Sequence, residues 1–479
     1  MSRFQLLRPV RRVALGGITL SLLLSGCAVP PPPARLAPPA DAASFASERS
    51  FAALDHHDWP SDGWWRAYND LQLDQLIAEG VASATDLRVA EARFNRARAI
   101  VGQSRSQLMP TLTASAEAGV SQQSDNYLFP SGFAPRGWPD YGQASLALNW
   151  ELDFWGKNRA ALSAAKSEAQ AAEAEAAASR LAVSAGIASA YADLASLYVE
   201  RDAAGNAVKI RRQTYDLMKM RKAQGLETDG PVKRAESALA TAKGEAALLD
   251  ENLALARNRI AALMGAGPDR GLKIARPTLN TAVTVGLPAN IPAELIGRRP
   301  DIIAARLRAE ASSSRIKQAK AAFYPSINLN AIVGMQALGL GNVFKSGSDF
   351  GSAAPAISLP IFDGGRLRSS YRGAEADCEQ AVAQYDGTLV QALREVADAA
   401  TMQRALGHRL EQAKIAESAA EAAWHVADNR YRGGLATYLD VLVAEDSLIA
   451  ARRAVASLQT RAFSLDVALV RALGGGFRS

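Results

Sequence analysis

The placement of proline constrains the fold of this chain more than any other feature of its sequence. No proline occurs from Asp140 through Gly230 or from Ile361 to Ser479, whereas most prolines beyond residue 60 cluster at 110–139, 268–300 and 325–360. Proline inside a helix costs about 3 kcal/mol, because it lacks an amide hydrogen and clashes with the preceding turn. Two long proline-free tracts, rich in Ala, Glu, Arg and Leu, therefore predict two long helical regions separated by other structure.

The chain is also doubled. Residues 86–111 match residues 301–326 at an offset of 215, which places Arg93 over Arg308, and residues 221–236 match residues 430–445 at an offset of 209. A third match pairs residues 154–156 with residues 362–364 at an offset of 208. Three matches in one order indicate an internal repeat. Each half is predicted to run helix, two strands, long helix, turn, long helix.

Four segments alternate between apolar and polar residues, which is the pattern of a strand with one apolar face. They are 112–121, 144–152, 326–336 and a shorter return strand at Ile357, Leu359 and Ile361. Runs of about 9–11 residues cross a bilayer when tilted. Taken singly, these segments equally fit strands that cover a soluble core, because the signal of a membrane strand is weak. The secretory anchor described below favours the membrane interpretation.

Four strands are too few to close a barrel. In lipid a barrel must be closed, because the bilayer offers no hydrogen-bonding partner to an open strand edge. The smallest bacterial barrels have about 8 strands. The strand count therefore predicts that the chain assembles with further copies of itself.

The two long helices are expected at residues 157–222 and 366–431, each 66 residues long. Alanine-rich runs such as 160–165 and 171–178 place small residues at many positions that face neighbouring helices. A plain periplasmic coiled coil is the alternative for these helices alone, but a hollow wall of helices explains better why alanine dominates. The expected fold class is mixed α and β, mainly α: a barrel of long helices joined to a transmembrane β-barrel.

The N-terminus has the features of a secretory signal. Basic residues at positions 3, 8, 11 and 12 precede a short apolar stretch at 13–24, and Leu24-Ser25-Gly26-Cys27 follows. A generic cleavage site would end at Gly26 without needing a cysteine. However, Leu-Ser-Gly-Cys resembles the bacterial lipobox, in which the thiol is diacylated and becomes the first mature residue. Two or more acyl chains hold a protein firmly on a membrane.

Composition and missing motifs exclude several functional classes. The chain carries 54 Lys and Arg against 48 Asp and Glu without a purely basic block, so nucleic acid is not expected as a partner. The sequence contains no apolar run of 18 or more residues, so it predicts no membrane-spanning helix. Phosphate-binding Gly-rich loops, His-Glu-x-x-His and Gly-x-Ser-x-Gly are all missing from the sequence. Neither an enzyme activity nor a cofactor is expected.

The two cysteines and four histidines do not suggest a metal site. Cys378 falls in a predicted helix and is expected to be a small buried residue. His56 and His57 lie between two aspartates, but no further histidine nearby completes a ligand set, so a solvated loop is expected. His408 and His425 are expected on the surface of a long helix.

Several motifs in a fixed order resemble the TolC/OprM/NodT outer membrane factors. They are Gly-Arg-Arg-Pro-Asp-Ile at 297–302, Phe-Tyr-Pro-Ser at 323–326, Leu-Pro-Ile-Phe-Asp-Gly-Gly-Arg at 359–366 and the segment 431–442. This resemblance covers nearly the whole mature chain. It implies a homotrimer in which four strands from each of three chains close a twelve-stranded barrel, continued into the periplasm by a helical barrel. The implied function is the exit duct of a tripartite efflux pump or type I export system, with a periplasmic adaptor protein and an inner-membrane transporter as partners.

Two helix-to-helix turns resemble the periplasmic tips at which these factors meet the adaptor. They contain Gly225, Leu226 and Thr228 in the first half and Gly434, Leu435 and Thr437 in the second. Glycine permits the tight reversal and threonine caps the following helix, so the same residues also suit a plain turn between helices. The resemblance adds adaptor contact to this structural role.

Leu439 and Asp440 resemble the constriction of the closed channel, where threefold symmetry repeats each side chain as a ring. Three carboxylates near one axis attract cations and favour proton uptake as the ring narrows. The alternative for Asp440 is an exposed acid that stabilises the first turn of a helix through the helix dipole. Val443 stands where related proteins often carry another acid, which leaves the number of acidic rings open.

The expected organisation of the chain follows from these features. Residues 1–26 form a signal peptide, 27–60 a lipid anchor with a Pro/Ala-rich linker, 61–265 the first repeat, 266–290 a connector and 291–479 the second repeat. The protein is expected in the bacterial outer membrane, anchored to lipid through Cys27 and extending into the periplasm. A non-porous helical scaffold lipoprotein of the periplasm is the alternative function.

Overall fold

A computed structural model of the chain describes residues 30–35, 37–46, 48–51, 58–122, 124, 137–278, 288 and 291–478. The predicted signal peptide, Cys27, His56 and His57 lie outside the described residues.

The two halves of the chain repeat the same order of elements. The first half contains α4 (Thr85–Ser106), β1 (Thr111–Val120), β2 (Asp140–Leu152), α5 (Lys157–Ala223) and α6 (Asp229–Leu263). The second half contains α9 (Pro300–Ala321), β3 (Ser326–Leu338), β4 (Asp349–Ser358), α10 (Arg366–Arg432) and α11 (Tyr438–Ala472). Corresponding helices have 22, 67 and 35 residues in both halves. The predicted repeat is confirmed, and each long helix ends one residue later than expected.

Shorter elements connect and precede the repeated ones. They are η1 (Ala42–Ser44), α2 (Glu48–Phe51), η2 (Trp64–Tyr68), α3 (Leu71–Ser83), α7 (Pro268–Leu272), α8 (Ile291–Arg298) and η3 (Leu340–Asn342). The Asp70 carboxylate caps α3 by accepting bonds from the amides of Gln72 and Leu73 at 2.9 and 3.1 Å.

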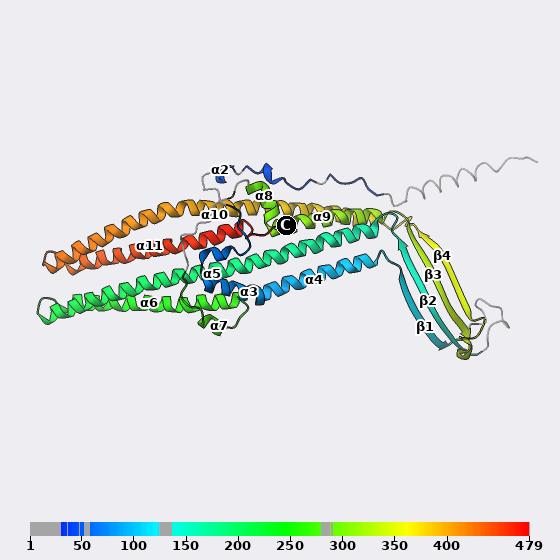
Figure 1. Ribbon diagram of the computed structural model, residues 1–479, viewed down its shortest axis with the longest axis horizontal. Coiled ribbons are helices and arrows are strands. Elements are labelled where there is room, and N and C mark those ends of the chain that lie inside the picture. The colour runs from blue at the N-terminus through cyan, green and yellow to red at the C-terminus, as the bar shows by residue number, and fades with distance from the viewer. Residues whose placement is uncertain are drawn as a thin grey trace, which may run out of the picture. The chain divides into compact units, whose positions relative to one another are not determined.

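The four strands form one antiparallel sheet in the order β1, β2, β3, β4 (Figure 1). Opposite residues of an antiparallel pair point to the same face, so the registers assign the faces. One face carries the rows Leu112, Leu148, Ala331 and Ala114, Leu146, Val333. The other face carries Asn149 opposite Asn330, Gln143 opposite Gln336, and Ser115 bonded to Ser145 at 2.9 Å. The predicted separation of apolar and polar faces is confirmed.

The return strand differs from the prediction. It was expected at Ile357, Leu359 and Ile361, but β4 begins at Asp349 and ends at Ser358, so the last two residues lie beyond it. Its apolar side holds mainly small residues, such as Gly351 and Ala353, and this makes the alternation weak. Pairing with β3, from Ser326 opposite Ser358 to Met335 opposite Asp349, determines where the strand lies.

Contacts divide the chain into two compact units, and each unit contains segments from both halves. The first unit comprises the described residues up to 38, with 95–171 and 306–384, and it holds the sheet. Phe323, Leu367 and Tyr371 form an apolar cluster in this unit. The second unit comprises 39–94, 172–305 and the described residues from 385 on, and it is helical.

Among its described residues, three apolar clusters hold the helical unit together. The first joins α3, α5, α6 and α11 through Leu73, Ile187, Ile260 and Phe463. The second joins α8, α10 and α11 through Leu295, Leu389 and Leu469. The third joins α5, α6, α10 and α11, which Figure 1 shows as two antiparallel hairpins side by side within this unit.

Part of the predicted linker is docked and not a free spacer. The amide of Ala34 donates to Glu375 Oε1 at 2.7 Å, and the amide of Ala40 donates to Asp386 Oδ1 at 2.8 Å. Ala42 is fully buried in the second cluster, and Phe45 packs against the same cluster. These contacts attach the segment to α10.

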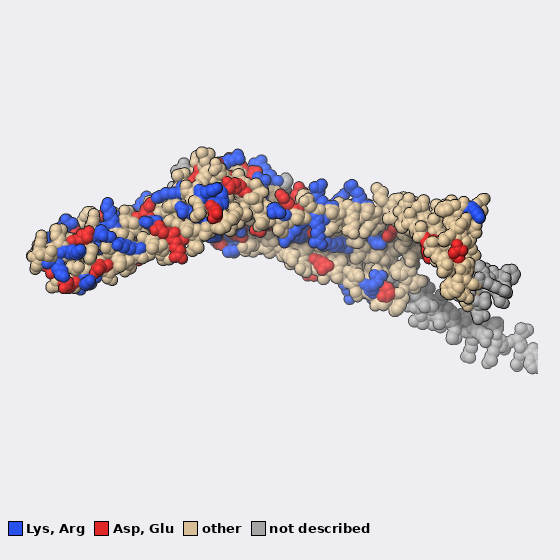
Figure 2. Space-filling view, turned by 90° about the horizontal axis from the view of Figure 1, so that it is seen from below, with Lys and Arg blue, Asp and Glu red and all other residues tan. Residues whose placement is uncertain are grey.

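Among the described residues, α5 contains one 18-residue window that is apolar enough to cross a membrane by length and composition. The sequence had suggested no such helix. Half of this window is buried inside the structure, which is also a property of a core helix. Figure 2 shows basic and acidic side chains interspersed over the helices, whereas the surface of the sheet consists mainly of other residues.

Candidate functional site

Two turns close the hairpins α5–α6 and α10–α11 with the same backbone bonds. Gly225 and Gly434 have φ of +74° and +77°, a left-handed conformation that favours glycine. The amides of Gly225 and Leu226 donate to carbonyls of α5 at 2.9 Å each, and those of Gly434 and Leu435 donate to α10 at 3.0 and 2.7 Å. Such bonds form the Schellman end of a helix. Both glycines therefore have the structural role that the sequence predicted.

The threonines after the two turns differ. Thr437 precedes α11 and forms a capping box with Asp440, whose Oδ2 accepts bonds from the Thr437 amide and hydroxyl at 2.8 Å each. Thr228 precedes α6 but makes no side-chain capping bond. The predicted cap at Thr228 is therefore wrong, because the third residue of α6 is Pro231, which has no amide hydrogen to donate.

Each turn presents an exposed leucine. Leu226 is 61% exposed and Leu435 is 74% exposed. Leu439, in the first turn of α11, is 59% exposed, and Val443 is 60% exposed. Asp440 is exposed as well, and its bonds to Thr437 lower the pKa of its carboxyl. Within one chain, Asp440 therefore caps α11 while both residues predicted at the constriction, Leu439 and Asp440, remain exposed.

Tyr431, the penultimate residue of α10, links the two hairpins. Its hydroxyl donates to Glu227 Oε1 at 2.7 Å, and Arg221 of α5 lies over its ring at 4.7 Å. The same arginine is 3.8 Å from the Glu227 carboxylate. Burial, followed by the bond to Glu227, raises the pKa of Tyr431. The sequence placed Tyr431 in a family motif without indicating this contact.

A pocket of about 370 Å³ lies between the two turns. The first hairpin contributes Arg221, Glu227, Pro231 and Arg234, and the second contributes Tyr431, Gly434, Ala436, Thr437, Tyr438 and Leu439. Of the tip residues predicted from the sequence, Gly434 and Thr437 line this polar depression, whereas the first turn contributes Glu227.

A buried charge pair, formed by Arg211 and Glu445, was not predicted from the sequence. Arg211 of α5 is 3.0 Å from Glu445 of α11 and also bonds to Asp446. Glu445 has no exposed surface and Arg211 is 5% exposed. A signal was present, since Glu445 interrupts an apolar stripe that contains Tyr438, Val441 and Leu448 at helical spacing.

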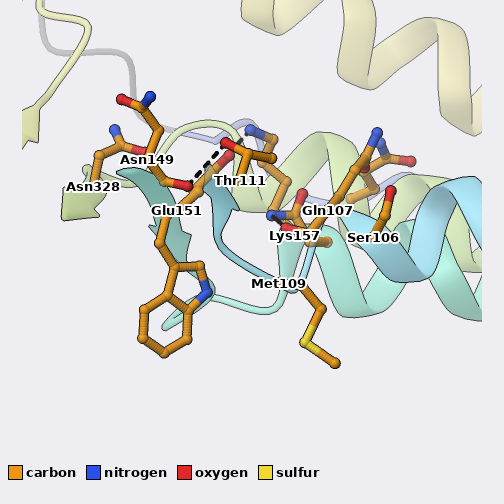
Figure 3. Close-up of a pocket in the computed structure, with 11 residues that line it drawn as sticks. Ser106, Gln107, Met109, Thr111, Asn149, Glu151, Lys157 and Asn328 are labelled. Carbon is orange, nitrogen blue, oxygen red and sulfur yellow. Dashed lines mark hydrogen bonds and ion pairs between the residues drawn. The ribbon is translucent and has the colours of Figure 1, made fainter. Parts of the chain in front are cut away.

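The polar face of the sheet continues into a second depression, of about 480 Å³, in the first unit (Figure 3). Thr111, Asn149 and Asn328 line it from three strands. The Thr111 hydroxyl donates to the Asn149 carbonyl at 3.1 Å, and Lys157 pairs with Glu151 at 2.9 Å. Hydrophilic groups therefore gather where the strands meet the helices.

Three further residues, Cys378, His408 and His425, are placed as the sequence suggested. Cys378 is a buried free cysteine in α10, and burial raises the pKa of its thiol. His408 and His425 are exposed on the same helix. In the part of the chain that the structure describes, no group of three or more His, Cys, Asp and Glu could hold a metal ion.

Comparison with known proteins identifies the family. The profile of the family described as "Outer membrane efflux protein" matches residues 76–266 and 291–475. The fusaric acid resistance protein FusA of Burkholderia cepacia is 35% identical over 378 residues, which are 76% of this chain and 69% of FusA. The toluene efflux pump outer membrane protein TtgF of Pseudomonas putida is 31% identical over 472 residues, 96% of each chain.

A solved structure agrees with these relatives. The crystal structure of the outer membrane protein VceC of Vibrio cholerae is similar with a TM-score of 0.83 and 46% identity, over 88% of this chain and 100% of that chain. The relatives are outer membrane efflux channels, so the function is that of a channel and not of a non-porous scaffold, and the location is the bacterial outer membrane. The chain belongs to the outer membrane efflux protein family.

Proposed function

We propose that three copies of this chain close one channel, to which each contributes its four strands. The sheet carries this proposal: it has an apolar and a polar face, and within the described chain β1 and β4 are each paired on one side alone. Lipid supplies no partner for such edges, so β1 of one copy pairs with β4 of the next until the barrel closes. The apolar face then meets lipid, and the polar face lines the duct.

Exposed apolar and aromatic side chains support this assembly. Trp155 and Tyr324 stack at one end of the sheet with centroids 4.8 Å apart, and Trp138 is 68% exposed at the other end. Aromatic girdles flank the apolar band of membrane barrels. On the helices, Leu248 and Leu255 are 55% and 56% exposed. Neighbouring copies would cover such leucines.

The assembly is tested by mass. In detergent, the purified protein should run at three times the mass of one chain and should lose this state only on unfolding. A stable monomer in detergent-free buffer would contradict the barrel.

We also propose that the two turns form the tips that contact a periplasmic adaptor protein, and that an inner-membrane transporter delivers substrates through it. Gly225, Leu226 and Thr228 supply the first tip, and Gly434, Leu435 and Thr437 supply the second. Leu435→Glu should abolish cross-linking to the adaptor and the associated drug resistance while the trimer persists. Leu272 of α7 is equally exposed, at 74%, and Leu272→Glu is the matched control. Equal loss in both variants would refute a specific tip contact.

The lipid anchor is proposed at Cys27. Replacing Cys27 with Ser should abolish acyl labelling and alter processing of the precursor, because a hydroxyl cannot take the role of the thiol. The barrel accounts for membrane insertion by itself, so export should be reduced and not lost. Unchanged labelling with palmitate would refute the anchor.

A further inference from the structure

Glu445 is a buried acid to which no described residue donates a hydrogen bond. It lies on α11 between the buried residues Val441 and Leu448, and none of its surface is exposed. Its Oε2 is 3.0 Å from Nη1 of Arg211, yet neither carboxyl oxygen has a hydrogen bond within the described chain, and nor has that nitrogen. A carboxylate taken out of water without donors is destabilised unless an opposite charge compensates it fully.

Arg211 cannot compensate Glu445 fully, because it also bonds to Asp446. Among the described residues, the other charged and titratable groups near Glu445 are Asp428 of α10, which pairs with Arg432 at 2.8 Å, and the buried Tyr438 of α11, which lines the tip pocket together with Arg234 of α6. Burial raises the pKa of Glu445 from its ordinary value of 4.5 to about 7; Arg211 opposes this shift, and Asp446 and Asp428 add to it.

We infer that Glu445 and Arg211 form a positioning pair whose protonation state determines how tightly α11 packs on α5 beside the tips. The neutral carboxyl keeps the two hairpins together, because Arg211 retains Asp446 as its partner. The ionised carboxyl favours a state in which α11 withdraws and Glu445 reaches water. The consequence for the duct rests on the proposed channel, whereas the packing is a property of the chain itself.

The direction of the pH effect follows from linkage. The packed state binds the proton of Glu445 more tightly than a state in which this side chain is solvated, so acid favours packing. As the pH rises through about 7, the packed state loses this advantage. For pKa values of about 7 and 4.5, the ratio of released to packed hairpins should rise about tenfold between pH 6 and pH 8.

Spin labels at the exposed positions Gln213 on α5 and Ser447 on α11 would measure this ratio in the purified protein. Glu445→Gln is neutral at every pH, so the packed population should stay constant. The matched control is Glu236→Gln, because Glu236 occupies the same repeat position on α6 but is exposed and pairs with Lys233 at 2.8 Å. This control should respond to pH as the wild type does.

A second variant keeps the test decisive if Glu445→Gln folds poorly. Asp446→Asn frees Arg211 to pair with Glu445 alone, so the midpoint of the transition should move to lower pH. A wild-type response that survives in Glu445→Gln, or one of opposite sign, would overturn the inference. Current recordings distinguish a failure of this inference from a failure of the proposed channel. A spin-label distance that depends on pH in a protein that conducts no current contradicts the channel. A conducting channel whose spin-label distance does not depend on pH contradicts the role of Glu445 and Arg211.

Discussion

The hydroxyl of Tyr431 donates a 2.7 Å hydrogen bond to Glu227, a residue 204 positions away in the other half of the chain. Together with Arg221, these residues tie the turn after α5 to the end of α10. The two tips are therefore one connected structure and not two independent hairpins.

Tyr431→Phe removes this bond and keeps the ring on which Arg221 lies. The free energy of unfolding should fall by about 1 kcal/mol, the usual contribution of one hydrogen bond. Thermal unfolding of the trimer measures this loss. Tyr215→Phe on α5 is the control, since Tyr215 has a ring contact with Lys219 at 5.6 Å that the substitution retains. Equal effects of the two variants would argue against a special role of the Tyr431 hydroxyl.

The difference between the two caps predicts an asymmetric response. Thr437→Ala breaks the capping box with Asp440 and should cost about 1 kcal/mol. Thr228→Ala removes a side chain that makes no capping bond and should cost only a few tenths of that. Denaturant unfolding of both variants decides the matter, and a larger loss at Thr228 would contradict the assignment.

Arg299 of the Gly-Arg-Arg-Pro-Asp-Ile motif is buried and bonds to Asp301 at 2.6 Å, to Glu395 at 2.8 Å and to the Ala472 carbonyl at 3.1 Å. Arg299→Ala removes these bonds, but the Asp301 and Glu395 side chains are 40% and 31% exposed to water, so the substitution should cost about 1.5–3 kcal/mol. The neighbouring Arg298 is half-buried, pairs with Glu294 at 3.3 Å and lies over the Trp59 ring at 5.1 Å, so Arg298→Ala should cost only about 1 kcal/mol. Comparable melting temperatures of the two variants would refute this difference.

The constriction proposed at Leu439 and Asp440 predicts changes in ion flow. Asp440→Asn should lower the cation preference, and Leu439→Ala should raise conductance. Adjacent helical residues point about 100° apart, so one of the two effects should be clearly larger. Asp229→Asn, in the first turn of α6, is the control for general loss of charge near a tip. If bilayer recordings of both single variants and the double variant match the wild type, the constriction lies elsewhere and Asp440 has only a capping role.

Glu445 also predicts how overall stability depends on pH. Its pKa of about 7 in the folded protein exceeds its ordinary value of 4.5, so stability is highest when the group is protonated and falls as the pH rises between these values. Glu445→Gln avoids the cost of ionisation, about 3 kcal/mol at pH 8 and above and close to zero below pH 4.5. Unfolding of the wild type and of Glu445→Gln at pH 8 and below pH 4.5 measures the difference in their free energies of unfolding. A difference that does not change with pH would contradict the burial argument.

The sequence by itself determined the features that depend on local chemistry. Proline placement marked the two long helical regions, since each proline removes a backbone bond wherever it stands in a helix, and the helices expected within them end one residue short of the observed ends. Alternation located three of the four strands, and the glycines at the tips were predictable because a left-handed turn favours a residue without Cβ. The motifs in series also indicated the family.

Only the tertiary structure decided the features that depend on a second element. Pairing with β3 determines where β4 lies, although small residues had obscured its pattern. Glu236 and Glu445 occupy the same repeat position, yet one is exposed on α6 and the other is fully buried beside Arg211 of α5. Repeated sequences specify the same helix, but the cost of burying a charge depends on the neighbouring helix, and the two hairpins do not have the same neighbours.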